Sequence, residues 1–533
     1  MNLPEIPRAT YPEIRAALIE RREIALLDVR EEDPHAQAHP LFAAHLSLSR
    51  LELEVYARLP RRDVPIVTLD HGEGLAERAA RKLIGLGYRQ VSVLKDGIDG
   101  WRAAGGELFR DVNVPSKAFG ELVDAIRHPP ALAAEDVYAL LGGDDDVLIV
   151  DVRRFDEYHT MNIPGSINVP GAELVLRVPE LAPDPRTRVI VNCAGRTRSI
   201  IGAQSLINAG LPNPVAALRN GTIGWTLAGL GDKLEHGQTR RFKPVPETGR
   251  QQAEARARAL AEKAGVKWLS LADIEAWKNQ EGRTTYFIDV RDPDEYATGH
   301  LPGFRSVPGG QLVQETEMTA TVRGARIVLA DTDGARAAMT ASWLAQMDWE
   351  VYVLTPPPPA EWHETGPWQA PLPPLLAPPL IKPATLAEWL RSDNPPVIVD
   401  FTSHANYCRG HIPGAWYALR AELGQAAKKL PQASRYVLTC LSSLLARYAH
   451  ADFAREVDGE IVVLDGGTHA WQAAGLPLEQ DTRLASDPID RYRRPYEGTD
   501  NSPAAMQAYL DWEFGLVEQL QRDGTHHFKV LRV

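Results

Sequence analysis

Residues 189–199 read Val-Ile-Val-Asn-Cys-Ala-Gly-Arg-Thr-Arg-Ser, and this stretch decides the fold. An apolar, β-branched run ends at Cys193, and a short loop of small and basic residues follows it. Apolar residues then recur with helical spacing over residues 200–211. This order predicts a buried strand, a tight loop and a helix that opens near Ser199. One thiol therefore lies at the mouth of a helix.

Cys193 is a candidate nucleophile because of its neighbours in the sequence. The backbone N–H groups of the loop, the positive end of the helix, Arg196 and Arg198 all favour a thiolate over a thiol. A free cysteine has a pKa near about 8.5, and such surroundings can lower it below about 7.5. The alternative is a structural cysteine, because cysteine is among the most buried residue types. A core cysteine, however, does not require Gly195 and two nearby arginines.

Composition limits the classes of function. The chain has 533 residues, 44% of them hydrophobic, which is enough for about three or four domains with full-sized cores. Its formal charge of −12 argues against nucleic acid or an anionic membrane as the main partner. The cysteines, Cys193, Cys408 and Cys440, lack the close spacing of a zinc site or a disulfide framework, so we expect no metal and no cofactor. No apolar run is long enough for a signal peptide or a membrane span, so we expect a soluble, cytoplasmic protein.

Elements around Cys193 recur along the chain. An Asp-Val-Arg element recurs at residues 28–30, 151–153 and 289–291, and as Asp-Phe-Thr at 400–402. A turn that ends in tryptophan recurs at residues 96–101, 220–225 and 466–471. The repeat is longer than that of a solenoid, so each copy is expected to be a domain. Strands and helices alternate in each copy, which predicts a small parallel sheet with helices on both faces.

The Cys193 loop and its flanking elements resemble the rhodanese family of sulfurtransferases. Residues 149–153, 163–170 and 220–225 are similar to the Asp-Val-Arg, His-Ile-Pro-Gly-Ala and Gly-Gly-x-x-x-Trp elements of that family. Asn162 and Asn220 replace the usual histidine and the first glycine. The resemblance implies an α/β protein with four tandem rhodanese-like domains and a C-terminal helical tail. We place these parts at residues 1–125 (no catalytic Cys), 126–245 (catalytic), 246–372 (a leading linker helix and no catalytic Cys), 373–485 (a degenerate loop) and 486–533 (the tail).

The other copies lack an intact loop. At the position of Cys193, the first and third copies have Asp70 and Asp331, which cannot hold a sulfane sulfur as a stable persulfide. The fourth copy has Cys440, but its loop contains neither glycine nor arginine, so a plain loop cysteine is the preferred interpretation. Cys408 lies away from any strand end and is interpreted as non-catalytic.

Linkers and the tail complete the predicted organisation. Residues 249–264, rich in Ala, Arg and Glu, predict a solvated helix, and the proline-dense residues 356–383 predict a stiff, extended crossing. Residues 504–521 carry apolar side chains at helical spacing and include Trp512 and Phe514. We expect this helix to cap the last domain. A homodimer interface is the alternative, because aromatic residues are enriched at interfaces.

The resemblance implies a two-step sulfur transfer. The Cys193 thiolate attacks the outer sulfur of a small anionic donor such as thiosulfate, sulfite leaves, and cyanide or a thiol takes the sulfur from the persulfide. Asp151 and Arg153 are expected to be structural. The predicted catalytic residue is Cys193. Six further residues are expected to bind the substrate, by surrounding the persulfide and binding the donor's oxygens. They are Ala194, Gly195, Arg196, Thr197, Arg198 and Ser199.

Two other functions remain open at this stage. Cysteine phosphatases and arsenate reductases also place a cysteine before an arginine at a helix start. Those that resemble the rhodanese fold have Cys-x5-Arg, whereas Cys193 and Arg198 form the tighter Cys-x4-Arg. Because three copies lack the loop, a non-enzymatic scaffold that relays sulfur or docks a partner is the second alternative.

Overall fold

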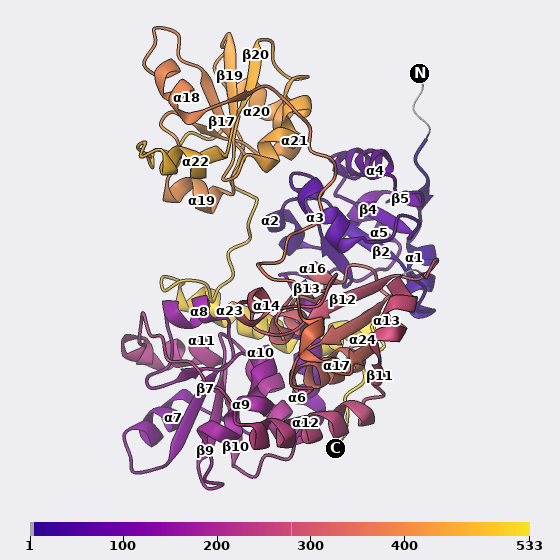
Figure 1. The fold of residues 1–533 in the computed structure, drawn as a ribbon, viewed down its shortest axis with the longest axis vertical. Helices are drawn as coiled ribbons and strands as arrows, with labels where there is room; N and C mark the ends of the chain where they lie inside the picture. The colour runs from indigo at the N-terminus through magenta and orange to yellow at the C-terminus, as the bar shows by residue number, and fades with distance from the viewer. Residues whose placement is uncertain (1–4, 279, 533) are drawn as a thin grey trace.

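The computed structural model describes residues 5–278 and 280–532, and this part of the chain contains four five-stranded sheets (Figure 1). All four sheets have the same strand order, which is β6-β10-β9-β7-β8 in the second domain. The fourth strand of each domain in chain order lies at the centre of its sheet, and the first and third strands lie at the edges. The paired strands of the second sheet run parallel. The predicted α/β fold with four tandem units is therefore confirmed.

The second domain positions Cys193. Its central strand β9 lies between β7 and β10, and apolar side chains of β9 such as Ile190 and Val191 are fully buried. Because the strands are parallel, the loops after β7 and β9 meet at one edge of the sheet. The elements of this domain are β6 (Ala131–Leu132), α7 (Ala134–Leu141), β7 (Val147–Asp151), α8 (Phe155–Thr160), β8 (Ile167–Asn168), α9 (Leu174–Leu181), β9 (Arg188–Asn192), α10 (Thr197–Asn208), β10 (Val215–Leu218) and α11 (Gly221–Trp225).

The other three domains repeat this strand order, and their helices differ in number and length. The first contains β1 (Arg8–Ala9), α1 (Tyr11–Ile19), β2 (Ala25–Asp28), α2 (Glu32–Gln37), β3 (Ala43–His45), α3 (Leu51–Arg58), β4 (Ile66–Leu69), α4 (Leu75–Gly85), β5 (Val91–Leu94), α5 (Gly97–Ala103) and α6 (Val114–Arg127). The third contains β11 (Lys267–Leu269), α13 (Leu271–Lys278), β12 (Thr285–Asp289), α14 (Pro293–Thr298), β13 (Arg305–Ser306), α15 (Gly309–Gln314), α16 (Thr316–Thr319), β14 (Arg326–Ala330), α17 (Arg336–Gln346) and β15 (Glu350–Leu354). The fourth contains β16 (Leu380–Ile381), α18 (Pro383–Trp389), β17 (Val397–Asp400), α19 (His404–Arg409), β18 (Trp416–Tyr417), α20 (Leu423–Lys429), β19 (Arg435–Thr439), α21 (Leu444–Phe453), β20 (Glu460–Leu464) and α22 (Gly467–Ala473).

Helix α12 (Glu247–Lys263), which links the second and third domains, is not the solvated helix that its charged composition predicts. It packs against α17 of the third domain and α9 of the second. Ala253, Ala257, Leu260 and Ala261 recur on one face and are buried. These small side chains let the helix approach its neighbours closely, while its charged residues occupy the opposite face.

The tail does not cap the last domain, which corrects the expectation from the sequence. Helix α23 (Pro503–Phe514) packs against α6 and the π-helical turn Thr226–Leu230, and α24 (Leu516–Asp523) packs against α6. In Figure 1 these yellow helices lie between the first three domains, whereas the orange fourth domain stands apart from them. The tail therefore joins the first and second domains beside the Cys193 loop.

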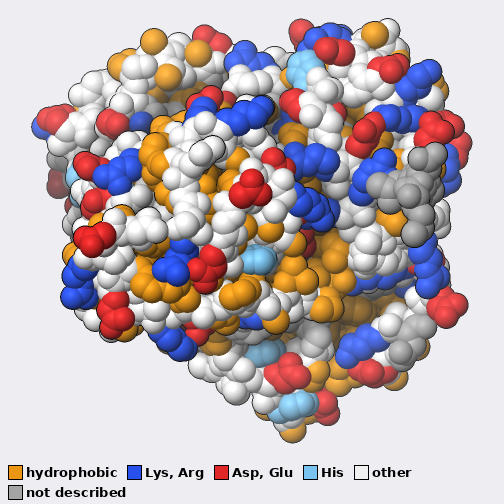
Figure 2. Space-filling model, turned by 90° about the horizontal axis from the view of Figure 1, so that it is seen from above, with side chains coloured by type: hydrophobic (Ala, Val, Ile, Leu, Met, Phe, Trp, Pro, Cys, Tyr) orange, Lys and Arg blue, Asp and Glu red, His pale blue; other side chains and the backbone are white. Residues whose placement is uncertain are grey.

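The surface carries charges of both signs. On the face shown in Figure 2, acidic and basic side chains alternate and are separated by apolar groups. Among the described residues, no helix combines the length and the apolar character that a membrane crossing requires.

Candidate active site

The Cys193 loop connects β9 to α10, which begins at Thr197, two residues before the predicted start. Only 1% of the surface of Cys193 is exposed. Its Sγ lies 3.3 Å from the hydroxyl oxygen of Ser199, and that hydroxyl donates a hydrogen bond to the carbonyl of Arg196 at 2.9 Å. The thiol and the first turn of α10 are thus in direct contact, as the sequence predicts.

The first turn of helix α11 binds two carbonyl groups of the Cys193 loop. The amide of Thr222 donates to the carbonyl of Cys193, and that of Ile223 donates to the carbonyl of Ala194, both at 3.0 Å. Gly221 has φ of 55°, and a Cβ at this position would clash with the carbonyl oxygen of Cys193. This close approach therefore requires glycine. In the described part of the chain, the amides of residues 195–198 donate to no acceptor, which leaves them free for an anion.

The equivalent loops of the first and third domains show where such an anion sits. The carboxylate of Asp70 accepts hydrogen bonds from the amides of Gly72 and Ala76, both at 3.0 Å. The carboxylate of Asp331 accepts from the amides of Gly334 and Ala337, both at 2.7 Å. Each aspartate occupies the nest with its own carboxylate. The amides of these two loops therefore bind a side-chain carboxyl group, and both loops have an aspartate where the second domain has Cys193.

Arg198 is the cation that acts on the thiol. Its guanidinium makes a bidentate pair with Glu157 at 2.7 and 2.9 Å. Burial alone would raise the pKa of Glu157, but Arg198 outweighs it and lowers this pKa to about 2. The fixed pair holds the positive charge beside the loop, where it opposes the increase that burial causes in the pKa of Cys193.

Arg196 points away from the thiol, toward the first domain. It donates to both carboxylate oxygens of Glu121, at 2.7 and 2.9 Å, and to Asp124 at 2.8 Å. Its guanidinium also lies 4.4 Å from the centre of the Phe514 ring in the tail. The side chain of Arg196 thus ties the loop to α6 and α23.

Burial reverses the expected direction of the Cys193 pKa. Burial raises this pKa above its ordinary value, while the charge of Arg198 and the contacts with Ser199 oppose the increase. The sequence-based expectation of a lowered pKa is therefore wrong for this arrangement, because the covering helices remove the thiol from water. Solvent or a further cation beside the loop would lower the pKa of Cys193 and so favour the thiolate.

The tail and the first domain supply residues that the sequence analysis missed. The carboxylate of Glu513 accepts from the Tyr509 hydroxyl at 2.8 Å and lies 3.5 Å from the hydroxyl of Thr197. Glu513 is fully buried, its second oxygen has no partner among the described residues, and burial raises its pKa to about 8. The ammonium of Lys117 lies 5.1 Å from the centre of the Tyr509 ring. No local pattern reveals these contacts, because more than 300 positions separate Glu513 from Thr197.

The structure also places the other residues that the sequence analysis named. Arg153 donates to Asp151 at 2.7 Å and to the carbonyl of Met161, which agrees with a structural pair. Cys440 is buried, and burial raises the pKa of its thiol, while hydrogen bonds from the backbone of its own loop oppose this increase. Cys408 is exposed on α19. In the described ranges, no group of three or more His, Cys, Asp or Glu side chains is placed to hold a metal ion.

A family model described as "Rhodanese-like domain" matches residues 12–104, 133–228, 270–355 and 382–474. The chain therefore belongs to the rhodanese family and contains four such domains. Its structure is similar to that of a thiosulfate sulfurtransferase from Pseudomonas aeruginosa, with 64% sequence identity, a TM-score of 0.97, and coverage of 99% of this chain and 100% of that one.

Curated relatives match over single segments. The thiosulfate sulfurtransferase GlpE of Coxiella burnetii is 27% identical over 86 residues, which are 16% of this chain and 78% of that protein. The HTH-type transcriptional regulator Rv0324 of Mycobacterium tuberculosis is 35% identical over 96 residues, or 17% of this chain, and the match spans 42% of the regulator.

Proposed function

We propose that this protein is a thiosulfate sulfurtransferase that carries a sulfane sulfur as a persulfide on Cys193. The observation that carries the proposal is the loop itself, in which one thiol lies beside free amides at the start of a helix. The full-length similarity to a thiosulfate sulfurtransferase supports the choice of donor. The aspartates Asp70 and Asp331 at the equivalent positions, and a loop around Cys440 without glycine or arginine, support the second domain as the site of the chemistry.

The reaction has two steps. The thiolate of Cys193 attacks the outer sulfur of thiosulfate, the S–S bond of the donor breaks, and sulfite leaves with the bonding electrons. An acceptor, cyanide or a thiolate, then attacks the outer sulfur of the persulfide and releases the Cys193 thiolate. No net oxidation or reduction by a third reactant is needed, because one sulfur atom passes between two nucleophiles.

Loop residues stabilise charge in both steps. Amides from Ala194 to Ser199 surround the persulfide as the equivalent amides surround the carboxylates of Asp70 and Asp331. Arg198 stabilises the thiolate and attracts the anionic donor. We leave the side chain of Arg196 out of the donor-binding set, because Glu121 and Asp124 already occupy it.

The experiment is a comparison of two reactions in three proteins. Transfer of sulfur from thiosulfate to cyanide is measured for the natural chain, Cys193→Ser and Cys440→Ser, together with hydrolysis of an aryl phosphate. We expect Cys193→Ser to lose the transfer and Cys440→Ser to retain it. Aryl phosphate hydrolysis that depends on Cys193, without any thiosulfate turnover, would establish the phosphatase alternative instead.

A further inference from the structure

A cavity of about 430 Å³ lies between the second and third domains, next to the Cys193 loop. Thr197 and Arg198 form part of its wall, whereas Cys193 and Ser199 do not. Its volume lies within the range of small-molecule sites. The cavity is therefore adjacent to the active site and distinct from the persulfide nest.

One side of the cavity is apolar. Ile201 of α10 faces Val290, Met339 and Trp343 of the third domain across the interface. The indole N–H of Trp343 donates to the hydroxyl of Ser205 at 2.8 Å, so the two domains are joined at this side and the Trp343 ring is held in place. Such a wall suits a hydrocarbon or aromatic body.

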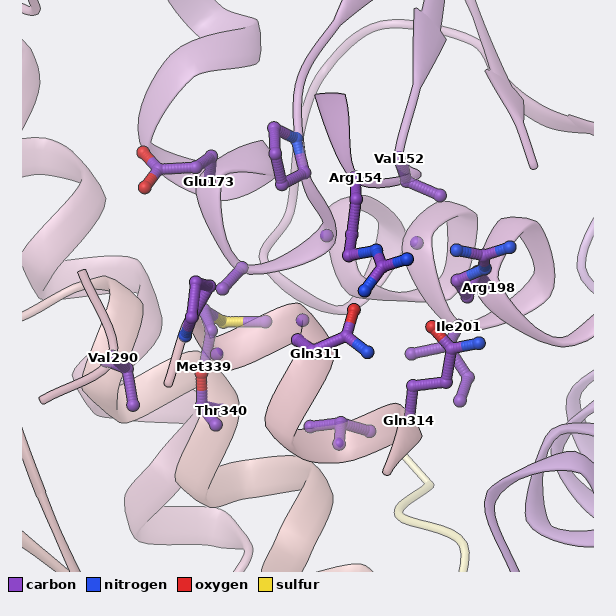
Figure 3. A pocket seen from close by; sticks show the side chains of 18 of the residues that line it. Val152, Arg154, Glu173, Arg198, Ile201, Val290, Gln311, Gln314, Met339 and Thr340 are labelled. Carbon is purple, nitrogen blue, oxygen red and sulfur yellow. The ribbon is translucent and has the colours of Figure 1, made fainter. Parts of the chain in front are cut away.

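Three polar side chains converge at the other side. Figure 3 shows Arg154, Gln311 and Gln314 pointing toward one another inside the cavity, with Arg198 beside them. In the described part of the chain, neither glutamine amide makes a hydrogen bond. Arg154 has ion pairs at 3.4 Å to Asp156 and 3.7 Å to Glu157 but donates no hydrogen bond. These donors are unused in the protein itself.

Two acidic residues of the wall, Glu173 and Asp292, are paired with arginines other than Arg154. Glu173 pairs with Arg336 at 2.8 Å and with Arg177 at 2.9 Å. Asp292 pairs with Arg241 at 2.8 Å. Asp156, which also lines the wall, pairs with Arg154 at 3.4 Å, but the N–H groups of Arg154 donate no hydrogen bond to it and remain for a negatively charged group.

We propose that this cavity is a binding site for a small organic anion with an apolar body and one carboxylate or sulfonate group. The acidic group lies against Arg154, Gln311 and Gln314, and the body packs against Met339 and Trp343. Because Cys193 does not line the cavity, binding does not require the persulfide chemistry.

The test is calorimetric titration of the full chain with naphthalene-2-sulfonate, and with naphthalene-2-methanol as the neutral analogue. We expect one sulfonate per chain, and binding of the neutral analogue weaker by about tenfold. Arg154→Leu removes the cation and is expected to weaken sulfonate binding by about tenfold. Gln311→Trp fills the cavity and is expected to abolish binding of both compounds.

Two controls keep the test independent of catalysis and of folding. Arg186→Leu removes an exposed arginine that pairs with Asp184 outside the cavity, and Cys193→Ser removes the nucleophile. Both variants are expected to bind like the natural chain, so loss of sulfur transfer in Cys193→Ser leaves this proposal intact. The proposal would be overturned if the natural chain did not bind the sulfonate. It would also be overturned if Arg154→Leu and Gln311→Trp both bound the sulfonate with the affinity of the natural chain.

Discussion

The carboxylate of Asp331 accepts a hydrogen bond from the amide of Ala337, six residues later, as the thiol of Cys193 contacts Ser199, six residues after it. The two loops therefore share one nest, filled in the third domain by a side chain and available in the second for substrate. Four domains share the sheet, and in the second the loop combines a thiol with Gly195 and Arg198.

If the nest binds anions, emptying it should create a sulfate site. In Asp331→Ala the amides of Gly334 and Ala337 lose their acceptor, and sulfate can replace it. We expect sulfate, compared with chloride at equal ionic strength, to stabilise this variant by about 1 kcal/mol more than the natural chain. Thermal unfolding measures the difference, with Asp184→Ala as a surface control. An identical response of all three proteins would contradict the shared nest.

The tail should make stability depend on pH through Glu513. Burial raises the pKa of Glu513 to about 8, above its value of about 4.3 in an unfolded chain. Its contribution to stability is therefore complete below the unfolded value and is lost as the pH rises through about 8. Glu513→Gln keeps an acceptor for the Tyr509 hydroxyl and does not ionise.

The free energy of unfolding of the natural chain should decrease between about pH 5 and pH 9. In Glu513→Gln this decrease should be smaller, by at least about 1 kcal/mol. Denaturant unfolding at the two pH values measures this. The substitution also removes a charge that raises the pKa of Cys193, so alkylation of Cys193 at about pH 9 should become faster. Parallel pH profiles for the two proteins would refute the assignment.

Substitution of Arg198 should affect sulfur transfer, whereas substitution of Arg196 should affect the stability of the fold. Arg198→Ala removes the cation that lowers the pKa of Cys193, and sulfur transfer should fall by about 100-fold or more. Arg196→Gln breaks the pairs with Glu121 and Asp124, so it should lower the unfolding free energy by about 3 kcal/mol, with much smaller effects on turnover per folded molecule. Steady-state kinetics and denaturant unfolding of both variants provide the comparison. The reverse pattern would exchange the two roles.

Asp289 and Asp400 end the second strands, β12 and β17, of the third and fourth domains, and replacing each by asparagine should change stability in opposite directions. Asp289 pairs with Arg291 at 2.7 Å, but the fourth domain has Thr402 at the equivalent position, and one oxygen of Asp400 has no partner among the described residues. Burial raises the pKa of Asp400 to about 6. This raised pKa means that stability is lost as the pH rises through about 6.

At about pH 8, Asp400→Asn is therefore expected to increase the unfolding free energy by about 1 to 3 kcal/mol, and Asp289→Asn to decrease it by a similar amount. Denaturant unfolding distinguishes the two signs. Destabilisation by both substitutions would show that Asp400 has a favourable partner in solution.

The sequence predicts the domains and the loop well because both rest on local patterns. A β-branched strand followed by a helix locates Cys193 within the printed sequence, and the repeat locates Asp70 and Asp331. The Asn220 substitution is also compatible with the family turn, because asparagine tolerates the left-handed φ of 60° observed there.

The remaining features depend on contacts between distant segments. The apolar spacing of α23 predicts a helix but cannot say which domain it covers, and the pairing of Arg196 with Glu121 joins residues 75 positions apart. The same limit explains α12, whose alanine face finds its partners only when two domains come together. The cavity between α10 and α17 likewise has no signature in either helix alone.

The central claim is that Cys193 alone carries the transferred sulfur. The direct test is mass spectrometry of the full chain after thiosulfate treatment, followed by peptide mapping under conditions that preserve persulfides. We predict a gain of about 32 Da on the peptide that contains Cys193, no gain on the peptide with Cys440, and no gain in Cys193→Ser. Sulfur loading of Cys193→Ser equal to that of the natural chain would contradict the account.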